Sequence, residues 1–99
     1  MAIKIHHGSG NAFTDVGFDL GTAESLRLRS ELMITIEKEI VARGLTQAKA
    51  AALFGTSQRR INDLTRGKID RLNIDTLVTM LGHAGISVKL TTRRNRRVA

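Results

Sequence analysis

The chain has 99 residues, among them no cysteine, proline, tryptophan or tyrosine, and its 16 Lys and Arg outnumber its nine Asp and Glu. This length favours one compact domain and excludes a two-domain enzyme. The lack of cysteine excludes a disulfide framework, a thiolate zinc site and a cysteine nucleophile. The longest apolar run, residues 50–54, is too short to span a membrane, and the first residues lack the apolar core of a signal peptide. We therefore expect a cytoplasmic protein with no membrane partner.

The net charge of +7 is unevenly distributed along the chain. Residues 1–58 contain six basic and six acidic side chains, whereas residues 59–99 contain ten basic and three acidic ones, so the whole excess follows Gln58. Such a one-sided basic field attracts polyanions, and nucleic acid is the commonest of these for a small basic domain. A solubilising surface with a basic tail is the alternative.

The Gly-rich residues 1–21 predict an irregular N-terminal segment. Phe13 and Phe18 lie in it and either pack on the domain or form a docking patch; we favour packing, because the chain has few aromatic side chains to leave exposed. Residues 22–92 follow as a helical domain with a C-terminal strand, and residues 93–99 as a basic tail.

The first predicted helix begins after Thr22 as its N-cap and runs to about Arg43, where Gly44 ends it. Its apolar positions follow helical spacing and predict one buried face, formed by Leu26, Met33, Ile36 and Ile40 and widened by Leu28 and Leu32.

Three shorter helices follow, each with a polar N-cap. Thr46 caps residues 47–54, Ser57 caps residues 58 to about 66, and Asn73 caps residues 74–84. Gly55 and Gly67 end the first two. In the last of the three helices, we expect four inward side chains: Ile74, Leu77, Val78 and Leu81.

Residues 86–91 alternate between apolar and polar side chains, which predicts an amphipathic strand. A lone strand leaves its backbone groups unpaired, so it needs a partner. The candidates are residues 3–5 and the same strand of a second copy, and the second pairing would help a homodimer to form.

The two helices around residues 55–57 predict a helix-turn-helix. Ala50 and Ala51 allow the helices to cross closely, and Phe54, Ile61 and Leu64 fill the junction. The outward face of the second helix is then polar. A plain helical hairpin with a solvated, charged face is the alternative.

The side chains of that outward face suit DNA. Four of them match the hydrogen-bonding groups of base edges: Gln58, Arg59, Asn62 and Asp63. Asp63 is also placed to orient Arg59, four residues earlier. Helix N-termini and basic side chains complete a candidate phosphate footprint: Arg43, Thr46, Gln47, Ser57, Arg60, Arg66, Lys68 and Arg71.

Residues 45–68 resemble the helix-turn-helix of the Cro/CI and XRE repressor family, through Leu45-Thr46-Gln47, Gly55-Thr56-Ser57-Gln58 and the closing Leu64-Thr65-Arg66-Gly67-Lys68. The likeness extends over residues 22–84 and implies a lambda repressor-like helical bundle. It also implies that Gln47 anchors a phosphate and braces the second helix of the motif, the recognition helix, which begins at Gln58. Ala50 departs from the family, where a leucine is common.

Residues 10–18 and 85–90 are similar to the flanks of HigA-type antitoxins of bacterial toxin-antitoxin operons. This resemblance implies an antitoxin that represses its own operon and neutralises a toxin, often one that cleaves mRNA. We expect the repressor to act as a homodimer on two half-sites about one helical turn apart. The alternatives are a stand-alone XRE regulator and a protein-interaction module with only generic DNA affinity.

No enzyme, cofactor or metal site is expected. His6 and His7 are adjacent, which is a poor metal-ligand spacing, and residues 8–10 lack the Gly-Lys-Ser/Thr of a phosphate-binding loop. His83 is expected to interact with the negative end of its helix. Helical spacing places Leu53 outward, and residues 93–97 are expected to form a solvated tail or to add phosphate contacts.

Overall fold

The computed structural model describes residues 11–94 and contains five α-helices and one short 3-10 helix within them. The elements follow the chain in this order: α1 (Ala12–Asp15), α2 (Leu20–Arg43), α3 (Gln47–Leu53), α4 (Gln58–Thr65), η1 (Ile69–Arg71) and α5 (Ile74–His83). The predicted all-helical fold is confirmed. The stretch 3–5, His6 and His7, and residues 95–97 of the tail lie outside the described residues.

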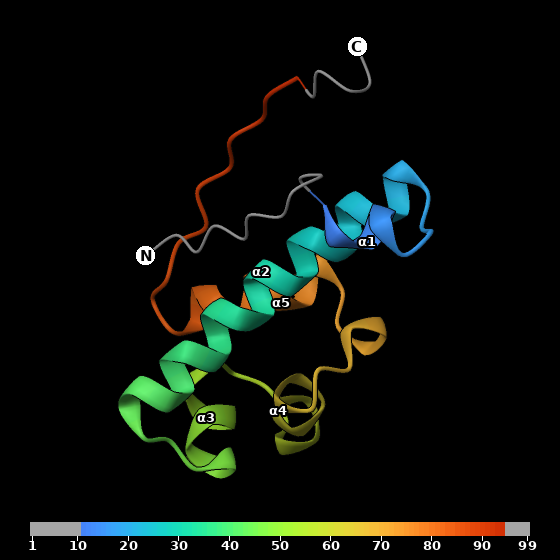
Figure 1. The fold of residues 1–99 in the computed structure, drawn as a ribbon. Coiled ribbons are helices and arrows are strands. Elements are labelled where there is room, and N and C mark those ends of the chain that lie inside the picture. Colours follow the sequence, from blue (N-terminus) through green and yellow to red (C-terminus); the bar gives the residue numbers. More distant parts are fainter. Residues whose placement is uncertain (1–10, 95–99) are drawn as a thin grey trace.

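Helix α2 is the axis of the fold. Its 24 residues span about 36 Å, with α1 beside its N-terminal end and α3 near its C-terminal end (Figure 1). Helix α5 lies along the middle of α2, and α4 lies below α5 in the same view. The arrangement separates the α1 end of the molecule from the helix-turn-helix.

The N-terminus of α2 differs from the prediction. Asp19, and not Thr22, is the N-cap: its Oδ1 accepts from the Thr22 backbone N–H at 2.8 Å, and the Thr22 hydroxyl donates to Oδ2 at 3.0 Å. A carboxylate accepts both bonds at once and is favoured by the positive end of the helix dipole. These bonds hold the pKa of Asp19 below its ordinary value.

A short helix, α1, occupies part of the segment expected to be irregular. The Asn11 side chain caps it by accepting from the Phe13 backbone N–H at 2.9 Å. Phe13 and Phe18 then pack edge to face, with ring centroids 6.3 Å apart. Phe18 remains 46% exposed, so its contact with Phe13 buries only part of its ring.

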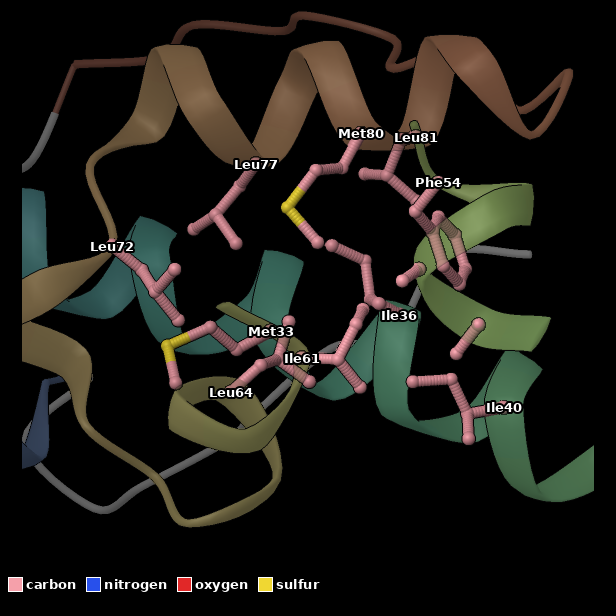
Figure 2. Close-up of a cluster of buried hydrophobic side chains, with 12 residues drawn as sticks. Met33, Ile36, Ile40, Phe54, Ile61, Leu64, Leu72, Leu77, Met80 and Leu81 are labelled. Atoms are coloured by element: carbon pink, nitrogen blue, oxygen red, sulfur yellow. The ribbon is translucent and has the colours of Figure 1, made fainter. Parts of the chain in front are cut away.

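The hydrophobic core gathers one face from each of α2 to α5 (Figure 2). The predicted α2 face is confirmed at three of its main positions, because Met33, Ile36 and Ile40 are buried, whereas Leu26 is only half-buried. Leu72, between η1 and α5, is fully buried among them and anchors the segment that joins these elements.

Two predictions of side-chain direction are wrong. Helix α5 buries Met80 and leaves Val78 39% exposed, and Figure 2 shows Met80 pointing into the core. Leu53, expected to point outward, is half-buried and packs against the core cluster. In both cases contacts with the neighbouring helices decide which side chains are buried, and helical spacing alone does not reveal those contacts.

The strand predicted over residues 86–91 does not form in the described part of the chain, residues 11–94. Ile86 packs against the core, and its backbone N–H donates to the Leu81 carbonyl at 2.9 Å. Beyond it, Val88 and Leu90 are 44% and 83% exposed. A strand needs a neighbouring strand to pair with, and residues 11–94 of one chain contain none.

Candidate nucleic-acid interface

The turn between α3 and α4 is fixed by local hydrogen bonds. The Thr46 hydroxyl accepts from the Lys49 backbone N–H, and the Ser57 hydroxyl accepts from that of Arg60 at 3.1 Å, so both predicted caps are confirmed. Gly55 adopts a φ of 62°, and a Cβ there would lie 2.7 Å from Cγ of His83 at the end of α5. The turn therefore requires glycine for its backbone and for its close contact with α5.

The crossing of α3 and α4 has the predicted small-residue contact. Ala50 is fully buried and Ala51 is 7% exposed, while Ile61 and Leu64 of α4 are buried on the facing side. Phe54 closes the junction with no exposed surface. Because one face of α4 is fixed in this way, its opposite face points away from the core.

The predicted base-reading side chains on that outer face differ in their exposure to solvent. Gln58 and Arg59 are exposed. Asn62 and Asp63 are half-buried, because at 100° per residue they fall on the two flanks of the face. The flank with Asn62 turns toward α3, and the flank with Asp63 turns toward η1.

Asn62 contacts the residue expected to brace the recognition helix. The Gln47 side-chain amide of α3 donates to Asn62 Oδ1 at 3.5 Å. The contact is long, yet it joins the N-terminus of α3 to the outer face of α4. Gln47 is exposed, so its side chain lies at the surface between the two helices.

Asp63 contacts a residue that sequence reasoning did not pair with it. Its Oδ1 lies 3.4 Å from Nη1 of Arg71 in η1, whereas the sequence had suggested Arg59 as its partner. The Asp63 side chain is 15% exposed and that of Arg71 49%. The two residues are separated by the Gly67 turn, so no spacing rule for a single helix could have found the pair.

The candidate phosphate contacts border the same helices. Arg60 and Arg66 are exposed and Lys68 is half-buried. Arg60 also donates to the Thr56 hydroxyl at 3.3 Å. Arg43 ends α2 near α3 and forms an ion pair with Glu39, with 2.9 Å between Nε and Oε2.

The described residues contain no metal-binding cluster and no membrane-spanning helix. Within residues 11–94, no group of three or more His, Asp or Glu side chains is placed to hold a metal ion. No helix of the same part is long and apolar enough to cross a membrane.

The fold and the geometry of α3 and α4 thus define a helix-turn-helix protein. A family model described as a helix-turn-helix domain matches residues 12–93, and the chain belongs to this family. A solved structure named "Putative XRE Family Transcriptional Regulator" is similar to the chain, with a TM-score of 0.68 and 26% sequence identity over 79% of this chain and 88% of that chain. No curated protein matches significantly. The two likenesses support a DNA-binding regulator of the XRE type.

Proposed function

We propose that the chain is a sequence-specific transcriptional repressor whose helix α4 enters the major groove of DNA. The outer face of α4 carries this proposal: exposed donor side chains stand on a helix whose other face is buried by Ile61 and Leu64. Arg59 donates two hydrogen bonds to guanine, and Gln58 and Asn62 pair with adenine. Such a repressor works in the cytoplasm, where operator DNA lies.

Phosphate contacts hold the helix in register. The exposed N-termini of α3 and α4, with Thr46, Gln47 and Ser57, supply backbone N–H groups and hydroxyls. Cations around them supply the charge: Arg43, Arg60, Arg66, Lys68 and Arg71.

The proposed active form is a homodimer that binds two half-sites about one helical turn apart. Residues 86–91 supply the pairing edge, since their side chains alternate and they pair with no other strand within residues 11–94, which suits an antiparallel partner of the same sequence. Val88 and Leu90 of the two copies then cover each other's exposed surface.

Fluorescence anisotropy tests the proposal directly. The protein is titrated with the DNA upstream of its own coding sequence and with scrambled DNA of equal length, at several salt concentrations. We expect a preference of about a thousandfold or more for the upstream DNA. Equal, steeply salt-dependent affinity for both duplexes would instead describe a generic polyanion binder.

The antitoxin function is a second candidate, and an exposed apolar patch favours it. Val16, Phe18 and Leu20 lie within five residues of one another and are 72%, 46% and 58% exposed. Val16 and Phe18 lie between α1 and α2, and Leu20 is the first residue of α2. This N-terminal end of α2 is remote from α4 (Figure 1). Asp15 and Asp19 are the charged residues between positions 11 and 20, and the next acidic residue, Glu24, is paired with Arg27 at 2.6 Å. An acidic, apolar surface suits a basic, RNA-binding toxin.

Coexpression with the product of the adjacent reading frame tests this second function. The wild-type chain should relieve growth arrest by that product, and a Val16→Ser, Leu20→Ser variant should not. Val41→Ser is the matched control, because Val41 is 74% exposed but lies near the other end of α2. Equal protection by all three proteins would reject this surface as the toxin site, and the absence of any toxic neighbour would reject the antitoxin function.

A further inference from the structure

Asp63 lies on the outer face of α4, the recognition helix, but its carboxylate contacts a cation, whereas its half-buried neighbour Asn62 contacts the Gln47 amide. The Asp63 side chain is 15% exposed and faces Arg71, whereas the first two residues of α4 are exposed. A side chain that reads a base edge has to reach into the groove. Asp63 would have to leave Arg71 to do so.

The backbone of the segment after α4 is held from several directions. The Lys68 backbone N–H donates to the Asp63 carbonyl at 2.9 Å, and the Arg29 guanidinium of α2 donates to the Ile69 carbonyl at 3.4 Å. Leu72 is fully buried just beyond η1. The backbone of Arg71 is therefore fixed beside the C-terminal part of α4.

One contact with Asp63 leaves most of the Arg71 guanidinium available. The contact uses Nη1, and a guanidinium carries five N–H donors in a rigid plane. The Arg71 side chain is 49% exposed, so its other donors can reach a DNA phosphate. A carboxylate that holds the plane in advance removes part of the entropy lost when a long side chain is ordered on binding.

We infer that Asp63 is a positioning residue: it orients Arg71 toward a phosphate next to the half-site and reads no base itself. The inference rests on the proposed function. It replaces the cytosine contact suggested by the sequence with a contact that acts on all DNA sequences alike. Arg71, in turn, becomes the phosphate-binding residue that depends on the recognition helix for its orientation.

The test is a double-mutant cycle of Asp63→Asn and Arg71→Ala. Its probe is a DNA duplex selected by the wild-type protein from a random pool, together with single-base variants of that duplex. Loss of the Asp63 negative charge favours DNA in both backgrounds, so the difference between the backgrounds isolates the effect that passes through Arg71. Asp70→Asn is the matched control, because it removes an exposed carboxylate from the same segment.

The effect of Asp63→Asn on affinity should differ between the two backgrounds. For every duplex, it should be less favourable by up to about fivefold when Arg71 is present than when Arg71 is replaced by alanine. Asp63→Asn should also lower the steepness of the salt dependence by about one unit, as Arg71→Ala does, and the double variant should lower it no further. The salt slope counts phosphate contacts, so a loss of stability alone would not change it. Asp70→Asn should act equally in both backgrounds.

A change of preference at a single base pair, present in both backgrounds, would show that Asp63 reads a base and would overturn the inference. An equal effect of Asp63→Asn in the two backgrounds would also overturn it. If the wild-type protein selects no preferred duplex at all, the proposed function fails, and the inference fails with it.

Discussion

Residues 46–83 and residues 86–91 both carry regular apolar patterns, but only the first region forms the elements that its pattern predicts. Its three α-helices, α3, α4 and α5, each begin at a side-chain cap, and their apolar faces meet within the same chain. The second region leaves Val88 and Leu90 exposed. A helix satisfies its own backbone, whereas a strand depends on a partner. Substitutions in each region, and at the N-cap of α2, test this difference.

The largest effect should come from Phe54→Ala, at the junction of the helix-turn-helix. Phe54 is fully buried between α3 and the rest of the core, so its removal leaves a cavity. We expect the free energy of unfolding to fall by about 3–5 kcal/mol. Urea denaturation followed by circular dichroism measures the loss. A loss below about 1 kcal/mol would mean that the junction is not a continuous part of the core.

Gly55→Ala and Gly67→Ala form a matched pair that separates backbone strain from close packing. Both glycines have a positive φ, of 62° and 71°. A Cβ at Gly67 meets no atom within 4 Å, whereas a Cβ at Gly55 lies 2.7 Å from Cγ of His83. Each variant should lose about 1–2 kcal/mol to strain, and Gly55→Ala about 1 kcal/mol more to overpacking. Thermal unfolding should show this order, and His83→Ala should remove the difference.

Asp19→Asn should change how stability depends on pH. Hydrogen bonds from Thr22 lower the pKa of Asp19 below its ordinary value of 3.8. A lowered pKa in the folded state adds stability above the unfolded pKa, and this stability is lost as the pH falls through the folded pKa. Asparagine still caps the helix but does not titrate.

Denaturation midpoints of the two proteins, measured between about pH 6 and pH 2, should therefore differ most at the higher pH and converge in acid. Parallel curves over the whole range would show that the Asp19 carboxylate does not stabilise α2.

The smallest effect on folding should come from Val88→Ser, Leu90→Ser, in the C-terminal segment. Both side chains are exposed, so the unfolding free energy of the dilute monomer should change by less than about 0.5 kcal/mol. Sedimentation equilibrium should nevertheless show weaker self-association, while the control Val41→Ser associates as the wild-type chain does. Unchanged association in the double variant would place the dimer contact elsewhere.

Local signals predicted most of the fold. Thr46, Ser57 and Asn73 were expected to cap helices, and their side chains do so. Such a cap involves residues only two or three positions apart, so the sequence contains the whole signal. The start of α2 was missed because Asp19 and Thr22 are both good capping residues, and only the folded chain shows which side chain accepts the bonds.

Signals that depend on distant residues were less predictable. Contacts with other helices decide which side chains of α5 are buried, and they bury Met80 and not Val78, which lies about 200° away around the helix. At the candidate interface, the inner residues Ile61 and Leu64 were predicted correctly. The ion pair of Asp63 with Arg71 was not, because the Gly67 turn and η1 bring those side chains together.

The central claim is that the outer face of α4 recognises specific bases, and the binding profiles of Arg59→Ala and Lys68→Ala test it most directly. Each protein is titrated with the selected duplex and with all its single-base variants. We expect Arg59→Ala to lose about 1–3 kcal/mol of discrimination at one base position, and Lys68→Ala to weaken binding to every duplex alike. A uniform loss with both variants would contradict base recognition by α4.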